Sequence, residues 1–113
     1  MRTPTKELLE SHYEEHKDRS FFPDIIKRTS AGPVCCMVWE GQDVILTGRK
    51  IIGATNPSSA EPGTLRGDGA IATGRNNIHG SDSVESAIRE INLWFDKDEV
   101  LDWDSHDQKW VYE

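Results

Sequence analysis

Only one segment of this 113-residue chain has the pattern of an interior β-strand. Val34–Trp39 is apolar on both alternating faces, which is typical of a strand with sheet neighbours on either side. A second, short strand is expected at Ala70–Gly74. Several segments have helical patterns, so we predict an α+β domain in which helices outnumber strands.

Three helices are predicted in the first half of the chain. Thr5 can cap the first of them, which presents apolar residues and His12 on one face. A second helix is expected from Phe21 to the break at 30–33, and Asp43 can start a third.

The strongest helical pattern lies near residue 90. Asp82 and Glu85 are spaced as a capping pair. The apolar stripe that follows comprises Val84, Ala87, Ile88, Ile91, Trp94 and Phe95. Between this helix and the third one, residues 53–74 are rich in Gly, Pro, Ser and Thr, which predicts a long loop of the kind that usually has a function.

Length and charge limit the classes of function. The chain is long enough for one domain, which we place at 1–113. The net charge of −7 disfavours nucleic acid as a partner. No apolar run approaches the ~18 residues of a membrane span, and the first residues do not resemble a signal peptide. A cytoplasmic protein without a membrane segment is expected.

His79 is the residue with the clearest chemical potential. It lies between the predicted short strand and the strongest helix, next to Gly80, which permits a sharp turn. A neutral imidazole is a usable nucleophile, and Glu90 is placed to fix its tautomer. A structural histidine in a turn is the alternative. His12 and His16 have the spacing of two zinc ligands, but without an evident third ligand we expect an exposed helix face.

Basic residues near this histidine favour a phosphate ligand. Arg49, Arg66 and Arg75 lie in or beside the loop, and guanidinium groups match phosphate oxygens in a planar fork. Thr55 adds a hydroxyl group, and Phe21 could stack on a flat ring. Together they predict a nucleotide-binding cleft in which the histidine receives a phosphoryl group.

At these residues the sequence resembles the nucleoside diphosphate kinases. The similarity rests on Arg75-Asn76-x-Ile78-His79-Gly80-Ser81-Asp82-Ser83-Val84-Glu85-Ser86, on Thr55-Asn56-Pro57 and on Pro62–Asp68. It continues through His12-Tyr13, Asp18-Arg19-x-Phe21-Phe22 and the terminal Trp110-x-Tyr112-Glu113. The histidine motif is specific, and the similarity covers essentially the whole chain.

The resemblance implies an activity: the γ-phosphate of a nucleoside triphosphate such as ATP or GTP passes to His79 and then to a nucleoside diphosphate, a ping-pong exchange. It implies catalytic roles for His79, Glu90 and Ser81. The nucleotide-binding residues it implies, together with Mg²⁺ on the phosphates, are Tyr13, Phe21, Arg49, Thr55, Arg66 and Asn76. It also implies subunit contacts through loop 53–74 and a homo-oligomer, which in the family pattern is a hexamer.

The family fold is ferredoxin-like, and the resemblance implies that this chain lacks its first β-α-β segment together with a phosphate-binding lysine. Val34–Trp39 and Ala70–Gly74 would then have no common partner strand. Unpaired buried backbone groups cost roughly 1–3 kcal/mol each, so we predict that the chain does not form a stable family monomer alone. The alternative function is therefore a catalytically silent subunit or fragment that associates with intact subunits.

Overall fold

The computed structural model describes residues 1–75 and 77–112, and its regular elements are all helical. The α-helices are α1 (Lys6–His12), α2 (Phe22–Thr29), α3 (Val44–Ile52), α4 (Leu65–Gly69), α5 (Val84–Trp94) and α6 (Gln108–Val111). The short 3₁₀ helices are η1 (Glu14–His16), η2 (Pro57–Ser59), η3 (Thr73–Arg75) and η4 (Lys97–Glu99). None of the described helices is long and apolar enough to cross a lipid bilayer.

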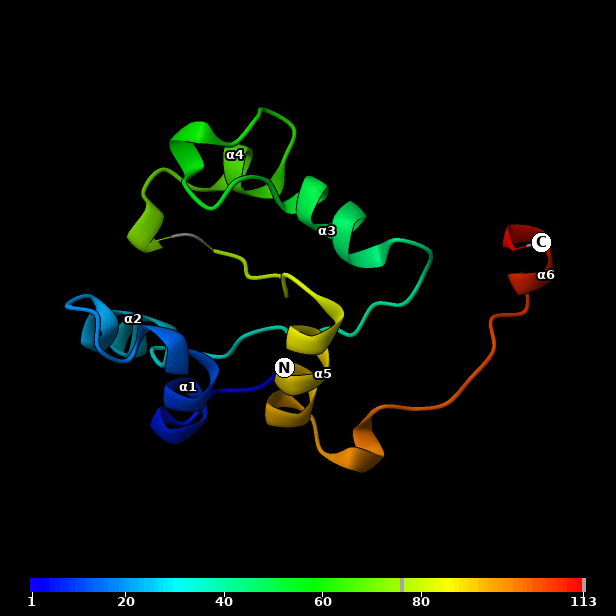
Figure 1. The fold of residues 1–113 in the computed structure, drawn as a ribbon, viewed down its shortest axis with the longest axis horizontal. Helices are drawn as coiled ribbons and strands as arrows, with labels where there is room; N and C mark the ends of the chain where they lie inside the picture. Colours follow the sequence, from blue (N-terminus) through cyan, green and yellow to red (C-terminus); the bar gives the residue numbers. More distant parts are fainter. Residues whose placement is uncertain (76, 113) are drawn as a thin grey trace.

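The helices form two groups joined by irregular chain (Figure 1). In one group α1 contacts both α2 and α5, and in the other α4 contacts both α3 and η2. Arg2 extends the first group, because its Nη1 donates to the carbonyl oxygen of Trp94 over 2.7 Å. The C-terminal helix α6 stands apart from both groups at the end of an extended segment (Figure 1).

The helix starts follow local capping chemistry. Thr5 accepts a hydrogen bond from the backbone N–H of Leu8 over 3.2 Å, so the predicted cap of α1 is confirmed. The predicted Asp82–Glu85 cap of α5 is wrong by one residue. Ser83 Oγ accepts the N–H of Ser86 over 3.1 Å, since its extended backbone directs the hydroxyl at that group. Asp43 precedes α3 in a left-handed conformation, φ 52°, without a side-chain cap.

Both predicted strands are wrong for the described chain. Within Val34–Trp39 only Val34 is paired, through an isolated antiparallel bridge to Arg2. At Ala70–Gly74 the chain instead enters η3. The physical reason is the same for both segments: an extended segment becomes a strand only when a neighbour takes up its backbone groups, and the described residues supply just Arg2.

The predicted loop at residues 53–74 is partly helical. It contains η2, α4 and the start of η3. Thr64 stabilises α4, because its Oγ1 accepts the N–H of Gly67 over 3.0 Å. The Gly and Pro content therefore predicted the breaks between short helices rather than a uniformly irregular loop.

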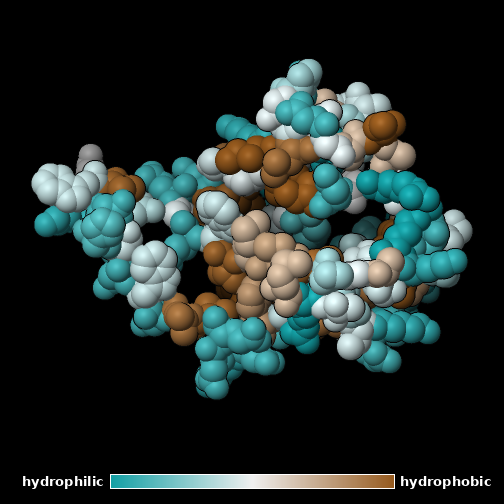
Figure 2. All heavy atoms as spheres, turned by 180° about the vertical axis from the view of Figure 1, so that it is seen from behind, coloured by the Kyte–Doolittle hydropathy of each residue, from teal (hydrophilic) through white to brown (hydrophobic). Residues whose placement is uncertain are grey.

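The apolar core is very small. Its buried hydrophobic side chains are Leu8, Leu9 and Ile26, where α1 and α2 meet. The described chain exposes 9100 Å², compared with about 6,300 Å² for a folded monomer of this mass. Apolar side chains lie open on the face seen in Figure 2. The stripe of α5 is partly uncovered, with Val84 66% and Ile88 57% exposed.

Candidate functional site

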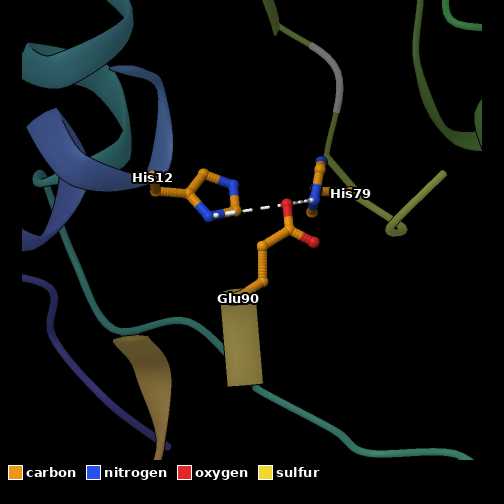
Figure 3. Close-up of side chains that lie close together, drawn as sticks. All are labelled: His12, His79 and Glu90. Carbon is orange, nitrogen blue, oxygen red and sulfur yellow. Dashed lines mark hydrogen bonds and ion pairs between the residues drawn. The ribbon is translucent and has the colours of Figure 1, made fainter. Parts of the chain in front are cut away.

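His79 and Glu90 form the centre of the site (Figure 3). Nε2 of His79 lies 2.7 Å from Oε1 of Glu90. An ionised carboxylate can only accept hydrogen bonds, so Nε2 carries the proton and the lone pair of the neutral ring is on Nδ1. Ser81 Oγ donates to the other carboxylate oxygen, Oε2. The sequence-based expectation that Glu90 reaches back to the imidazole agrees with this geometry.

His12 packs against this pair from α1. Its ring meets that of His79 edge to face, with centroids 4.6 Å apart, and its Nδ1 lies 3.8 Å from Glu90 Oε1. The His12 side chain is 5% exposed. Burial, followed by the charge of His79, lowers the pKa of His12 to about 4, against the opposing effect of Glu90. His12 is therefore held neutral at pH 7.

The expectation of an exposed helix face at His12 and His16 is wrong for His12. The irregular chain before α5 brings His79 against α1, a long-range contact that the local pattern could not indicate. His16 points elsewhere and lies against Phe21, with ring centroids 5.8 Å apart. Trp94 is a further member of the site that sequence reasoning assigned only to an apolar stripe. Its indole N–H donates to Nδ1 of His12 over 3.0 Å.

Two arginines hold the backbone on either side of the histidine. Arg66 donates from Nη2 to the carbonyl oxygen of Ile78 over 2.9 Å, and Arg49 donates from Nη1 to that of Gly80 over 3.1 Å. Arg66 is 7% exposed, and its Nε has no hydrogen-bond partner among the described residues. Burial, reinforced by the positive charge of Arg49, lowers the pKa of Arg66.

Two glycines lie beside these arginine contacts. A Cβ atom at Gly80 would press on Cδ1 of Ile52, which is the end of a flexible side chain that can move aside. Gly53 has φ +92° and its carbonyl oxygen accepts from Arg66 Nη1 over 3.1 Å. Arg66 thus ties the end of α3 to the residue before His79.

The other predicted nucleotide-binding residues lie at various distances from this centre. Tyr13 is half-buried with its ring 4.6 Å from that of His12, and burial raises the pKa of its hydroxyl group. Phe21 is 46% exposed and Thr55 is exposed in the segment that leads into η2. Asn76 lies outside the described residues. The site therefore presents a half-exposed imidazole fixed by a carboxylate beside two guanidinium groups.

A sequence profile of the nucleoside diphosphate kinase family matches residues 1–100. The chain belongs to this family. A nucleoside diphosphate kinase of Thermosynechococcus vestitus is 59% identical over 109 residues, covering 96% of this chain and 73% of the relative. The nucleoside diphosphate kinase of Saccharomyces cerevisiae is 57% identical over 106 residues, covering 94% and 69%.

Solved nucleoside diphosphate kinase structures have the same fold over the shared residues. A family protein from Babesia bovis superposes with a TM-score of 0.92 at 40% identity, over 98% of this chain and 75% of that one. The enzyme of Halobacterium salinarum, solved in complex with CDP, gives a TM-score of 0.90 at 46% identity, over 100% and 75%. The resemblance of the sequence to the nucleoside diphosphate kinases is therefore confirmed, and the family fold is confirmed over the shared residues.

Proposed function

We propose that this chain transfers the γ-phosphate of a nucleoside triphosphate to a nucleoside diphosphate through a phosphohistidine on His79. The observation that carries the proposal is the bond from His79 Nε2 to Glu90, because it leaves the Nδ1 lone pair as the nucleophile. The side chain of His79 is 50% exposed, so a nucleotide can approach it.

The proposed reaction has two balanced halves. Nδ1 attacks the γ-phosphorus, an N–P bond forms, the bond to the bridging oxygen breaks, and the nucleoside diphosphate leaves with that electron pair. The phosphorylated ring then carries a positive charge, which the carboxylate of Glu90 offsets. A terminal oxygen of a second nucleoside diphosphate attacks the phosphorus and returns the lone pair to Nδ1. Ser81 supports Glu90 throughout by donating to Oε2.

We assign the phosphates to the face that carries Arg49 and Arg66. The exposed side chain of Arg49 supplies a cationic donor there, and the buried guanidinium group of Arg66 adds positive charge. The nucleotide-binding set proposed on the family pattern is Tyr13, Phe21, Arg49, Thr55, Arg66 and Asn76. Mg²⁺ would enter on the phosphates of ATP or GTP, because it prefers oxygen ligands and the His12–His79–Glu90 cluster offers one carboxylate beside two imidazoles.

Labelling with γ-³²P-ATP and Mg²⁺ tests the reaction. We expect acid-labile label on the folded 113-residue chain, chased by added GDP and absent in His79→Ala. His106→Ala is the matched control, because His106 is an exposed histidine far along the chain. Label that persists in His79→Ala, or no label at saturating ATP in a folded sample, refutes the proposal.

The small core favours a second candidate function. Because the described residues bury so few large apolar side chains, the chain is suited to associate with intact family subunits, as a catalytically silent member of a mixed oligomer such as a hexamer. Loop 53–74 would make the contacts with those subunits. Sedimentation with and without an intact family enzyme distinguishes the two functions, since this one requires co-sedimentation without label on His79.

A further inference from the structure

Three potential metal ligands meet at the site described above. His12, His79 and Glu90 each offer one ligand atom, and these atoms all lie within 4.8 Å of one another. His79 Nε2 and His12 Nδ1 lie 2.7 Å and 3.8 Å from the same carboxylate oxygen, Oε1 of Glu90 (Figure 3). In a tetrahedral zinc site, donor atoms at ~2.1 Å from the ion are about 3.4 Å apart. Shifts of around an ångström would therefore bring the three donor atoms to that spacing.

We propose that His12, His79 and Glu90 form an inhibitory site for Zn²⁺, and that Trp94 restrains metal binding there. Two imidazoles with one carboxylate are a donor set that zinc adopts with one position left for water. The set does not suit Mg²⁺, which prefers oxygen ligands. The inference uses the same His79–Glu90 pair as the proposed function, but it concerns a different ligand.

The restraint comes from the hydrogen bond between Trp94 and His12. Nδ1 of His12 has one in-plane lone pair, and the indole N–H donates to it over 3.0 Å. A metal ion needs that same lone pair. Binding through Nδ1 therefore leaves the half-buried indole N–H without its partner, which weakens the site. The substitution Trp94→Phe would keep an aromatic ring and remove the competing donor.

The metal would block phosphoryl transfer by changing the tautomer of His79. Zn²⁺ takes the lone pair of Nε2, so the proton on that atom moves through solvent to Nδ1. The ring stays neutral, and no proton is lost overall. Nδ1 then has no lone pair with which to attack phosphorus. Glu90 meanwhile exchanges its bond from His79 for a bond to the metal.

Co²⁺ is the probe for this site, because it replaces Zn²⁺ and absorbs visible light in a tetrahedral site. The 113-residue chain is titrated without nucleotide, in the wild type and in Trp94→Phe, Trp103→Phe and His12→Gln. Trp103→Phe is the matched control, since Trp103 is 64% exposed. We expect a visible band that Zn²⁺ removes, binding at least about tenfold tighter in Trp94→Phe than in Trp103→Phe, and a loss of at least about tenfold in His12→Gln.

Equal binding by Trp94→Phe and Trp103→Phe overturns the restraint, and unchanged binding by His12→Gln overturns the site. The absence of a band in both the wild type and Trp94→Phe also overturns it. Should Trp94→Phe not fold, the comparison of His12→Gln with His106→Gln decides whether the site exists. Because no nucleotide is present, these results are independent of labelling with Mg²⁺-ATP. Failure of the metal site thus leaves the phosphoryl-transfer proposal standing, and the reverse also holds.

Discussion

Arg49 and Arg66 donate hydrogen bonds to the carbonyl groups of the two residues that flank His79. Arg66 is buried and bonds Gly53 as well, whereas Arg49 is exposed and makes one such bond. Arg66 therefore holds the backbone beside His79 more firmly than Arg49 does.

We expect Arg66→Ala to lower the free energy of unfolding by about 2–4 kcal/mol, because it leaves the carbonyl groups of Gly53 and Ile78 without a donor. Arg49→Ala should lower it by less than about 1 kcal/mol, since its bond is exposed. Urea unfolding followed by circular dichroism measures both. Equal losses in the two variants would show that burial does not distinguish them.

Glu90→Gln should slow the phosphorylation of His79 by roughly 100-fold or more, because an amide carries no charge to offset the phosphorylated ring. Glu85→Gln is the matched control on the same helix, where Glu85 is exposed. Rapid-quench labelling with γ-³²P-ATP measures the rates. A Glu90→Gln rate within threefold of the control would mean that the carboxylate does not act on His79.

Stability should fall in acid because of His12. Its pKa is lowered from 6.5 to about 4 by burial and by His79, with Arg89 acting in the same direction and Glu90 opposing. Between pH 4 and pH 6.5 the unfolded chain binds more protons than the folded one. The contribution of neutral His12 to the free energy of unfolding is therefore complete above about pH 6.5 and is lost as the pH falls toward 4. The loss is at most about 3 kcal/mol.

Unfolding in urea with EDTA, measured from pH 7.5 to 4.5, follows this loss. His12→Gln should reduce the slope against pH, because the substituted side chain does not titrate. His106→Gln, at an exposed position, should leave the slope unchanged. If the free energy of unfolding depends on pH equally in the wild type and in His12→Gln, groups other than His12 cause the acid sensitivity.

Ser83→Ala should destabilise the chain by about 1 kcal/mol, because it removes the hydroxyl that caps α5. Asp82→Asn, at the position expected from the sequence, should have a smaller effect. Thermal unfolding followed at 222 nm compares the two variants. A larger effect of Asp82→Asn would show that Asp82, and not Ser83, caps α5.

Amide hydrogen exchange should be fast at residues 35–40, whose N–H groups donate no backbone hydrogen bond within the described chain. The amides of 88–93 in α5 serve as the internal reference, because they lie inside a helix. Mass spectrometry of peptic fragments measures both. Protection at 35–40 equal to that of α5 would mean that a strand partner is bound there.

The sequence predicted the parts of this structure that depend on local chemistry. The cap at Thr5 and the helix over Val84–Trp94 are governed by neighbouring residues, and both were located within one residue. Val34–Trp39 has strand propensity, but pairing depends on a partner elsewhere, and among residues 1–75 and 77–112 only Arg2 supplies one. Propensity alone could not reveal that lack.

The candidate site also combines contacts that local sequence predicts with contacts that depend on distant residues. Glu90 was expected beside His79 because both belong to one contiguous stretch that ends in a helix. His12 and Trp94 are 82 residues apart, and their hydrogen bond follows from the contact of α1 with α5. A contact of that kind leaves no periodic signal in the chain. The family motif pointed to His79, Ser81 and Glu90, whereas the contacts of His12 and Trp94 required the three-dimensional structure.

Glu90 belongs to the last turn and a half of α5, while His79 and Ser81 lie on irregular chain ahead of that helix. The helix is thus the fixed frame against which the imidazole is aligned. Fraying of its C-terminal end would carry the carboxylate away while leaving the histidine in place. Loss of the His79–Glu90 contact on heating should therefore precede global melting and follow the unwinding of this one end.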